Sequence, residues 1–486
     1  MKARWLLFLC VFWLGMVMPE PAAMAATAQE SLVEQGRRLF FQETFAGNGR
    51  TCGTCHPASN DYTLDPAFIA RLPARDPLFV AAFDPRLRSL EHPTLLRKLA
   101  LVMVNADGFT RPAVPRAVPH LLALGRSIQV EPGSLIRPGR TSDLAAATGW
   151  SGDGAPGRGS LREFALGSVR QHFTRSMARV AGKDFRLPSS TELRALEAFM
   201  RSLGRRDELD IANGSGVTFR APLVERGRAL FNNEVSGPCS FCHRNATALN
   251  EGGFNGMFDI GVAQRADAPA HKLDPLIAGD GGFGVSPVIR VAGRTGYGNG
   301  RMNTPSLIEA ADTPPFFHDN AASTIEAAVE FYTTKTFADS PEGQALPIIR
   351  LSKDDVLAIA ALLRTLNALE NIRSSSTFAT QAVGKPAAIA RSLLRLGLGD
   401  ATEAVAVLSK GPRRLYADQV FLIERALKLL RSAVRVPSAA GRDHLLAKAV
   451  ELQTRAGKAM LLEPGLAQDG HSLRTMRSVA GGERRG

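Results

Sequence analysis

Apolar residues recur at helical spacing in two similar stretches, each of which leads into a loop with two cysteines. Leu32–Phe40 (LVEQGRRLF) and Leu223–Phe231 (LVERGRALF) are identical at seven of nine positions. Apolar side chains three and four residues apart lie on one face of a helix. The two stretches therefore predict equivalent amphipathic helices, each opening one copy of an internal repeat.

Each copy also closes with a predicted helix. The apolar patterns run from Leu193 to Leu203 and from Val356 to Leu366, and candidate N-caps precede them at Ser189 or Ser190 and at Ser352. Residues 132–159 and 274–305 are rich in Gly and Pro with little periodicity, which indicates loops. The pattern predicts a mainly α fold with two tandem domains, at 30–208 and 219–375.

The C-terminal part follows a different pattern. Residues 381–470 predict a basic helical appendage, and we expect 471–486 to be a disordered tail. From residue 381 to the end, the chain has 18 Lys and Arg against 9 Asp and Glu. A solvated basic face that packs on the domains and a docking surface for an acidic partner both fit this charge. Apolar spacing predicts its helices at Ala387–Leu396, Ala401–Leu408, Val420–Val434 and Leu445–Leu462.

Composition narrows the class of protein. Of the 486 residues, 45% are hydrophobic and 22% are charged, which is typical of a globular chain and excludes disordered and collagen-like classes. Lys and Arg number 59 against 46 Asp and Glu. A basic surface attracts nucleic acid or an acidic protein.

The N-terminus predicts a secretory signal peptide at residues 1–25. Lys2 and Arg4 precede an apolar stretch from Trp5 to Met18, and Ala23-Met-Ala25 offers a cleavage site. No apolar run of about 18 residues follows residue 30, so we expect no membrane span after cleavage. Export to the periplasm would also remove nucleic acid as a partner, and few aromatic residues interleave the charges of the appendage.

Four of the five cysteines form two copies of one motif. Cys52-Gly-Thr-Cys55-His56 and Cys239-Ser-Phe-Cys242-His243 both read Cys-x-x-Cys-His, while Cys10 lies in the signal peptide. This motif attaches c-type haem: the thiols add to the two vinyl groups and the histidine binds the iron. Positions i, i+3 and i+4 of a helical turn share one face, as this chemistry requires. A thioredoxin-like pair needs no histidine, and a zinc site would need the same cysteines, so we expect two covalently bound haem c groups.

Further segments complete a family pattern. The second half contains Asn303-Thr-Pro-Ser-Leu307, Pro315-Phe-Phe-His-Asp319 and Thr324-Ile-Glu326. The first half contains Trp150, Gly152-Asp-Gly154 and Leu161-Arg-Glu-Phe-Ala165. With the haem motifs, they resemble the bacterial di-haem cytochrome c peroxidases and their relative MauG, a maturase that oxidises protein tryptophans. The resemblance covers about residues 30–375 and leaves the appendage unexplained.

The resemblance implies roles for the haem ligands. His56 would be the proximal ligand of the peroxidatic haem, and His243 that of a second haem, which relays electrons or stores an oxidising equivalent. Tyr332 falls where the peroxidases carry a Met ligand and MauG-like proteins carry a Tyr. A Met ligand raises the reduction potential, whereas a Tyr oxygen stabilises oxidised iron. The alternative is that Tyr332 is a core aromatic and that Met302 or Met257 is the ligand.

The resemblance also implies residues around the first haem. Glu163 matches the distal carboxyl that moves a proton within bound peroxide, unless it is simply a surface residue. Trp150 is the candidate electron relay between the haems, although it could line the pocket or pack. No histidine lies between His56 and His92, which favours an open first haem. The histidines that remain as possible resting ligands are His92, His120 and His172.

A calcium ion between the domains is a further implication, with Asn105 and Thr304 as candidate ligands. The sequence thus predicts a periplasmic di-haem oxidoreductase that reduces hydrogen peroxide. It would oxidise a small redox protein or the side chains of a partner protein, as MauG does. The alternatives are a cytochrome c peroxidase with a small cytochrome donor and a non-catalytic electron-transfer cytochrome.

Overall fold

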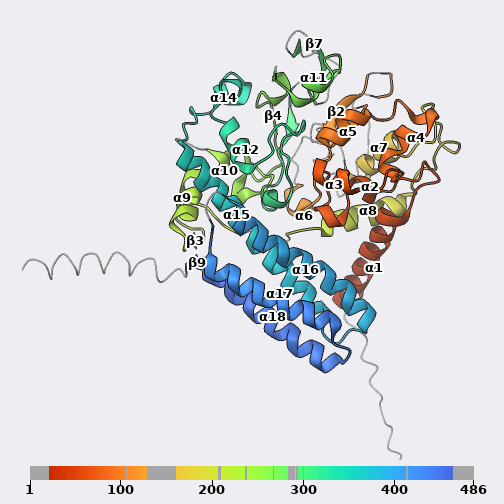
Figure 1. Cartoon of the computed structure of the whole chain (residues 1–486). Helices are drawn as coiled ribbons and strands as arrows, with labels where there is room; N and C mark the ends of the chain where they lie inside the picture. Colours follow the sequence, from red (N-terminus) through yellow and green to blue (C-terminus); the bar gives the residue numbers. More distant parts are fainter. Residues whose placement is uncertain are drawn as a thin grey trace, which may run out of the picture.

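The computed structural model arranges two halves side by side above a bundle of long helices (Figure 1). It describes residues 21–105, 108–110, 112–128, 160–205, 209–235, 238–265, 267–282, 290–291, 294–298, 300–411 and 414–462. The described residues are mainly helical, with a few short strands, as the sequence predicted. Trp150, most of the signal peptide and the tail at 471–486 lie outside the described residues.

The first half contains eight of the described helices and one antiparallel strand pair, β1 with β2. Short 3-10 turns lie between several of them, including η1 (Ala58–Asn60), η2 (Pro77–Phe79) and η3 (Pro85–Leu87). The elements are α1 (Pro21–Gln42), α2 (Cys52–Cys55), α3 (Pro66–Arg71), α4 (Val80–Phe83), α5 (Pro93–Leu99), β1 (Leu101–Val104), β2 (Val114–Ala117), α6 (Leu124–Ser127), α7 (Leu161–His172) and α8 (Ser190–Ser202).

The second half repeats this order with more short strands. β4 pairs with β8, and β7 pairs with β5 in parallel and with β6 in antiparallel orientation. The 3-10 turns are η4 (Arg244–Ala246), η5 (Val262–Gln264) and η6 (Ala310–Asp312). The elements are β3 (Thr218–Phe219), α9 (Pro222–Phe231), α10 (Cys239–Cys242), β4 (Met257–Phe258), α11 (Pro269–Leu273), β5 (Gly279–Asp280), β6 (Arg290–Val291), β7 (Arg294–Tyr297), β8 (Met302–Asn303), α12 (Ile325–Phe331), α13 (Lys335–Ala338), α14 (Pro341–Ala345) and α15 (Lys353–Ala382).

The repeated glycine explains how each half is closed. Gly36 of α1 lies against α8, where an added Cβ would come within 1.9 Å of the Ala195 carbonyl oxygen. Gly227 of α9 lies against α15 in the same way, and its Cβ would come within 2.0 Å of the Ala358 carbonyl oxygen. Only glycine permits such a close approach of two helices. The glycine shared by the two copies of the repeat therefore reflects the same helix crossing in both halves.

The predicted N-caps are confirmed. The hydroxyl of Ser189 accepts a hydrogen bond from the backbone of Glu192, and that of Ser352 accepts one from Asp355. In both helices the acidic side chain also accepts from the backbone amide of the serine, which completes a capping box. These local contacts fix where both closing helices begin.

The C-terminal bundle differs from its prediction in two places. α15 continues to Ala382 and so passes through the boundary predicted at residue 375, linking the second half directly to the bundle. The two helices predicted at 387–396 and 401–408 are one helix, α16 (Ala387–Ser409), which contains two glycines. Gly397 has a packing role, because it lies close to α15. A Cβ at this position would be 3.1 Å from the carbonyl oxygen of Ser375.

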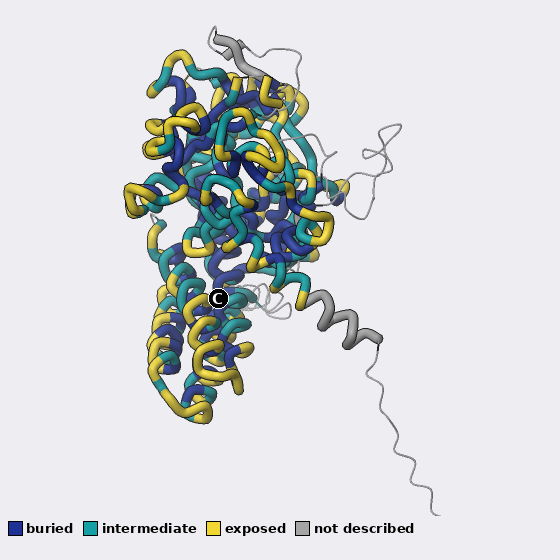
Figure 2. The backbone as a smooth tube through the Cα atoms, turned by 90° about the vertical axis from the view of Figure 1, so that its right-hand side faces the viewer, coloured by how far each residue is buried: buried dark blue, intermediate teal, exposed yellow. Residues whose placement is uncertain are grey.

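The rest of the bundle is α17 (Ala417–Arg435) and α18 (Ala439–Met460), followed by β9 (Leu461–Leu462). β9 pairs with β3, which returns the chain to the start of the second half. Buried residues face the inside of the bundle, and exposed residues cover its outer side (Figure 2). Among the described helices, none is long and apolar enough to cross a membrane.

Candidate haem sites

Each cysteine motif forms a single helical turn. α2 holds Cys52 and Cys55, and the backbone amide of His56 donates to the Cys52 carbonyl at 3.0 Å. α10 holds Cys239 and Cys242, and His243 makes the equivalent bond to Cys239 at 2.9 Å. In each case two thiols and one imidazole emerge from the same turn. The predicted helical arrangement of both motifs is present.

Both motif histidines are held in the same tautomer. Nδ1 of His56 lies 2.8 Å from the carbonyl oxygen of Tyr62, and Nδ1 of His243 lies 3.2 Å from that of Thr247. A carbonyl oxygen only accepts, so Nδ1 carries the proton and Nε2 keeps a lone pair. Burial lowers the pKa of each imidazole to about 4, which keeps the ring neutral. An iron ligand requires a neutral ring with a free lone pair on Nε2, and the hydrogen bond at Nδ1 fixes the orientation of that ring.

A cavity of about 310 Å³ lies beside the second motif. Its lining is largely apolar, as a porphyrin requires, and it also includes Thr304 of the Asn-Thr-Pro segment. The residues of chemical interest in its wall are Cys239, Cys242, His243, Met302 and Tyr332. Met302 remains a candidate ligand beside Tyr332, whereas Met257 is not one of the lining residues.

Tyr332 lies at the C-terminal end of α12 and packs against two phenylalanines. Its ring meets that of Phe337 edge-on, with centroids 5.0 Å apart, and that of Phe331 at 5.7 Å. Burial raises the pKa of Tyr332 well above its usual value, with the nearby cysteines as a smaller cause. The phenol is therefore neutral in the apolar cavity, and a nearby positive charge, such as bound iron, would favour its ionisation.

The first half supplies one wall of this second cavity. Thr63 and residues Arg116–His120 line it. Arg116 makes a two-point ion pair with Asp280, at 2.6 Å for both N–O distances, and both side chains are buried. The backbone amide of Ala117 also donates to the carbonyl of His318 at 2.7 Å. The two halves are thus joined at the edge of the second site.

The first motif lies between two apolar clusters. Cys52 packs against the cluster that contains Phe40, Phe199 and Leu196, whereas Cys55 packs against the one that contains Leu64 and Leu78. The Phe40 and His56 rings have centroids 6.1 Å apart. Burial raises the pKa of Cys52 to about 12 and that of Cys55 to about 11, so both thiols are neutral. These surroundings suit an apolar ring system attached through both sulfurs.

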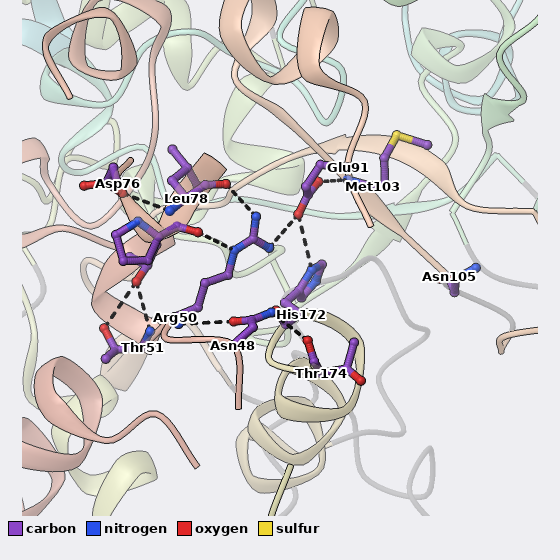
Figure 3. Close-up of polar contacts among 12 residues, drawn as sticks. Asn48, Arg50, Thr51, Asp76, Leu78, Glu91, Met103, Asn105, His172 and Thr174 are labelled. Atoms are coloured by element: carbon purple, nitrogen blue, oxygen red, sulfur yellow. Dashed lines mark hydrogen bonds and ion pairs between the residues drawn. The ribbon is translucent and has the colours of Figure 1, made fainter. Parts of the chain in front are cut away.

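A buried polar network that the sequence did not reveal lies behind this motif (Figure 3). Nη1 of Arg50 donates to Glu91 at 2.7 Å, and its other nitrogens donate to the carbonyls of Pro77 and Leu78. Neither side chain of the pair is exposed by more than 1%. Glu91 also accepts from the backbone of Met103 at 2.9 Å. The network thereby holds Arg50 in place, two residues before Cys52 at the start of the motif.

The same network reaches the end of α7. Nδ1 of His172 lies 3.9 Å from Glu91, and Asn48 donates to the carbonyls of His172 and Thr174 at 2.9 Å (Figure 3). Burial lowers the pKa of His172 to about 3, and Arg50 contributes in the same direction. His172 is neutral and lies on the inner face of its helix, with the buried residues Ala165 and Val169.

Glu163 lies in the first turn of the same helix and is exposed. It is nine residues from His172, which is about half a turn around an α-helix. Its backbone amide donates to the N-cap hydroxyl of Ser160 at 3.1 Å. The structure therefore places the predicted distal carboxyl and His172 on opposite faces of α7.

The other two candidate histidines have defined partners. Nε2 of His92 lies 3.2 Å from a carboxylate oxygen of Asp274, and its Nδ1 accepts from the backbone of Leu95 at the start of α5. Nε2 of His120 donates to the carbonyl of Ser306 at 3.3 Å, and the residue lines the second cavity. His120 thus lies where the two halves meet.

The candidate calcium ligands Asn105 and Thr304 each have hydrogen-bond partners within the chain. Oδ1 of Asn105 faces the Arg179 guanidinium at 3.5 Å, a cationic neighbour that disfavours a second cation. The carbonyl of Thr304 accepts a hydrogen bond from Asn255 at 3.1 Å, and its hydroxyl donates to Gly256. Within the described part of the chain, no three His, Cys, Asp or Glu side chains are arranged to hold a metal ion directly.

We expect Glu91→Ala to destabilise the fold by about 3–5 kcal/mol, because it leaves the Arg50 guanidinium buried without its carboxylate. Chemical denaturation with the haem-loaded protein measures this loss. Glu34→Ala is the matched control, since Glu34 pairs with Arg37 at 2.8 Å while both are about half exposed. That change should cost under about 1 kcal/mol. Equal effects of the two substitutions would contradict a structural role for the network.

Comparison with known proteins adds no assignment. No family model matches the sequence, and a search of curated proteins finds no significant match. Inferences about activity therefore depend on the residues themselves.

Proposed function

We propose that this chain is an exported di-haem c-type oxidoreductase that uses hydrogen peroxide as oxidant, in the manner of the di-haem cytochrome c peroxidases and MauG. The observation that carries the proposal is that one apolar cavity brings together Cys239, Cys242, His243 and Tyr332. The resemblance predicted this grouping from segments about 90 residues apart in the chain. The equivalent turn at Cys52–His56 supports a second haem c, and the repeated helix crossing supports two tandem cytochrome c-like domains.

The chain supplies ligands and proton-handling groups. A bound haem supplies the redox-active iron that reacts with peroxide. Nε2 of His56 and Nε2 of His243 would hold the two irons, each oriented by the carbonyl behind its ring. Reduction of one peroxide to two waters consumes two electrons and two protons. The resemblance assigns to Glu163 the transfer of a proton from the incoming peroxide to the departing oxygen. Because Glu163 lies on the exposed face of α7, this role requires that the first haem binds against that face.

Tyr332 favours MauG-like chemistry over that of an ordinary peroxidase. Ligation by its oxygen would stabilise the oxidised second haem, so that the two electrons can come from side chains of a partner protein. A cytochrome c peroxidase with a small cytochrome donor remains the alternative if Met302 is the ligand. The N-terminal signal pattern supports a periplasmic location, and calcium has no part in the proposal.

Peroxide titration of the ferric protein, followed by electron paramagnetic resonance, tests this function. We expect a high-spin signal from the first haem that is lost on addition of stoichiometric peroxide. A non-catalytic electron-transfer cytochrome would instead give two low-spin signals that peroxide leaves unchanged. That result would overturn the proposal while leaving both haem sites intact.

We expect Glu163→Gln to slow formation of the peroxide-oxidised state by about 10²–10⁴-fold, because an amide cannot transfer the proton. Stopped-flow absorbance measures the rate, and both haems should remain attached. Glu34→Gln is the control, since Glu34 is another exposed acid on a first-half helix. Wild-type kinetics in the Glu163 variant would remove this residue from the mechanism.

A further inference from the structure

Six carboxyl groups are close enough to repel one another where α16 packs against α15 and η6, and Asp61 of the first half is one of them. They form what we call the carboxylate cluster: Asp61, Glu309, Asp312, Glu370, Asp400 and Glu403. Asp61 follows η1 in the first half, Glu309 and Asp312 belong to η6 and its N-cap, and the others come from α15 and α16. The haem sites do not use any of them. The role of these six carboxyl groups must therefore lie outside haem binding.

Hydrogen bonds organise part of the cluster. Asp312 accepts from the side-chain amides of Asn367 and Asn371, the latter at 2.7 Å, and its backbone amide donates to Asn367 at 3.1 Å. Glu370 accepts from Arg205 at 3.0 Å and from Nε of Arg373 at 2.9 Å. Both cations are therefore engaged with the carboxylate that lies on α15.

Other members of the cluster lack such partners. Glu309 is only 5% exposed, and its Oε2 has no hydrogen-bond partner. Oδ2 of Asp400 is buried and has none either, although Ser374 bonds to the same carboxyl group. An ionised carboxylate without a partner is costly in such a place, and a proton removes that cost.

Burial is the main cause that raises the pKa of Asp61, Glu309, Asp312, Asp400 and Glu403, and neighbouring carboxylates add to it for all of these except Asp312. The pKa rises to about 9 for Asp61, to about 7 for Asp400 and to about 8 for Glu403. That of Glu309 rises well above its usual value, and that of Asp312 rises although its two amide partners oppose the change. Lys410, at the end of α16, favours ionisation of Asp312 and Glu403 but does not outweigh burial.

We propose that the carboxylate cluster is a proton-dependent clasp, which holds α16 against both halves and thereby sets the backbone behind the first motif histidine. With protons bound, the acids can donate hydrogen bonds to one another and pack. As the cluster ionises, repulsion between its members separates α16 from η6 and from Asp61. The second part of the proposal, control of the first haem, rests on the proposed function.

The link to the first site is short. Asp61 is followed by Tyr62, whose carbonyl accepts the proton of His56 Nδ1 at 2.8 Å. Both residues have left-handed backbones, with φ of 52° and 56°. Two consecutive non-glycine residues in this region are strained and persist only while their surroundings hold them. Movement of Asp61 would therefore displace the carbonyl that orients His56. The positive charge of Arg37 on α1 is close enough to Tyr62 to lower the pKa of its phenol, against the larger effect of burial.

The direction of the pH effect follows from the raised pKa values. In the opened state these acids titrate near their ordinary value of about 4, so opening releases protons above that pH. The stabilisation of the closed state is therefore complete below about pH 4, falls as the pH rises above that value, and is fully lost once the pH has passed the raised pKa values of about 7 to 9. We expect the opening equilibrium constant of α16 to increase at least about tenfold between pH 6 and pH 9.

Hydrogen exchange of the α16 peptides in the haem-loaded protein, corrected for intrinsic rates, tests the clasp over this range. Asp400→Asn with Glu403→Gln should remove the pH dependence, and Glu403→Gln alone serves if the double variant folds poorly. The matched control is Asp418→Asn with Glu424→Gln, two exposed acids of α17. Protection that does not change with pH in the wild type, or a double variant that behaves as the wild type, would overturn the proposal.

Further measurements distinguish failure of the clasp from failure of the proposed function, and a proton-dependent clasp from a cation site. We expect the reduction potential of the first haem to shift between pH 6 and pH 9 in the wild type, with the cluster-dependent part lost in the double variant. Peroxide reactivity is measured separately at pH 6, so its absence would count against the proposed function and not against the clasp. If α16 is protected by Ca²⁺ and not by protons, in parallel runs with Ca²⁺ or a chelator, the cluster is a cation site and the clasp is wrong.

Discussion

Replacement of Cys239 and Cys242 by alanine is expected to remove one of two covalently bound haems and to lower the haem content by about half. The reason is geometric, because these thiols lie on one helical turn and line the same cavity as His243 and Tyr332. Each thioether needs its own sulfur, and no third cysteine is near in the sequence. Mass spectrometry under denaturing conditions measures the number of haems per chain after maturation in a competent host.

The first motif provides the matched control for this experiment. Cys52→Ala with Cys55→Ala should also leave one haem, and the two variants should lose different components of the ferric spectrum. Loss at the second site should cost stability as well, because a cavity of about 310 Å³ then lacks its covalent filling. Wild-type protein with four free thiols and no Soret absorbance would contradict both haem sites at once.

The elements that sequence predicted well are those fixed by local chemistry. Ser189 and Ser352 start their helices because a hydroxyl and an acidic side chain three residues later satisfy the same free amides. The repeated Gly36 and Gly227 were visible as a pattern, yet their purpose is not local. Each glycine packs against a backbone carbonyl of a helix more than 100 residues away in the sequence, and only the structure shows this contact.

Long-range partners could not be predicted in this way. Arg50 and Glu91 carry no motif, and charged residues are usually exposed, so nothing in the sequence indicated that they form a buried pair. The members of the carboxylate cluster are spread from Asp61 to Glu403, and ordinary surface acids look the same in a sequence. The continuation of α15 beyond residue 375 could not be predicted, because polar residues interrupt the apolar pattern after Leu366.

In the candidate site, too, features set by local spacing could be predicted, whereas long-range placement could not. The two Cys-x-x-Cys-His turns follow from spacing alone, since a helical turn brings its first, fourth and fifth residues to one face. Tyr332 came from resemblance, and the structure lines the second cavity with it. Glu163 came from the same source, but it lies on the exposed face of α7, while His172 lies on the inner face. Spacing along a helix distinguishes these faces only when the buried side is known.

Tyr332→Met is expected to raise the reduction potential of the second haem by on the order of 0.1 V or more, within the roughly 0.8 V that axial ligands span. A thioether is a soft, neutral ligand that favours reduced iron, whereas a phenol oxygen, which iron would ionise, favours oxidised iron. The cavity accommodates the change, since methionine is flexible and Met302 already lies in the same wall. Spectroelectrochemistry of the two haems measures the shift.

Two further tyrosine variants decide whether Tyr332 acts as a ligand or as a packing residue. Tyr332→Phe keeps the edge-on contact with Phe337 but removes the oxygen, so a ligand role predicts a changed spin state and an altered spectrum of one haem. Tyr416→Phe is the control, because the Tyr416 hydroxyl donates to the Met460 carbonyl at 3.3 Å and is not in the cavity wall. It should leave both haem spectra unchanged. If Tyr332→Phe and Tyr332→Met also leave the spectrum and potential of the second haem unchanged, Tyr332 only packs, and Met302 becomes the candidate whose substitution should alter them.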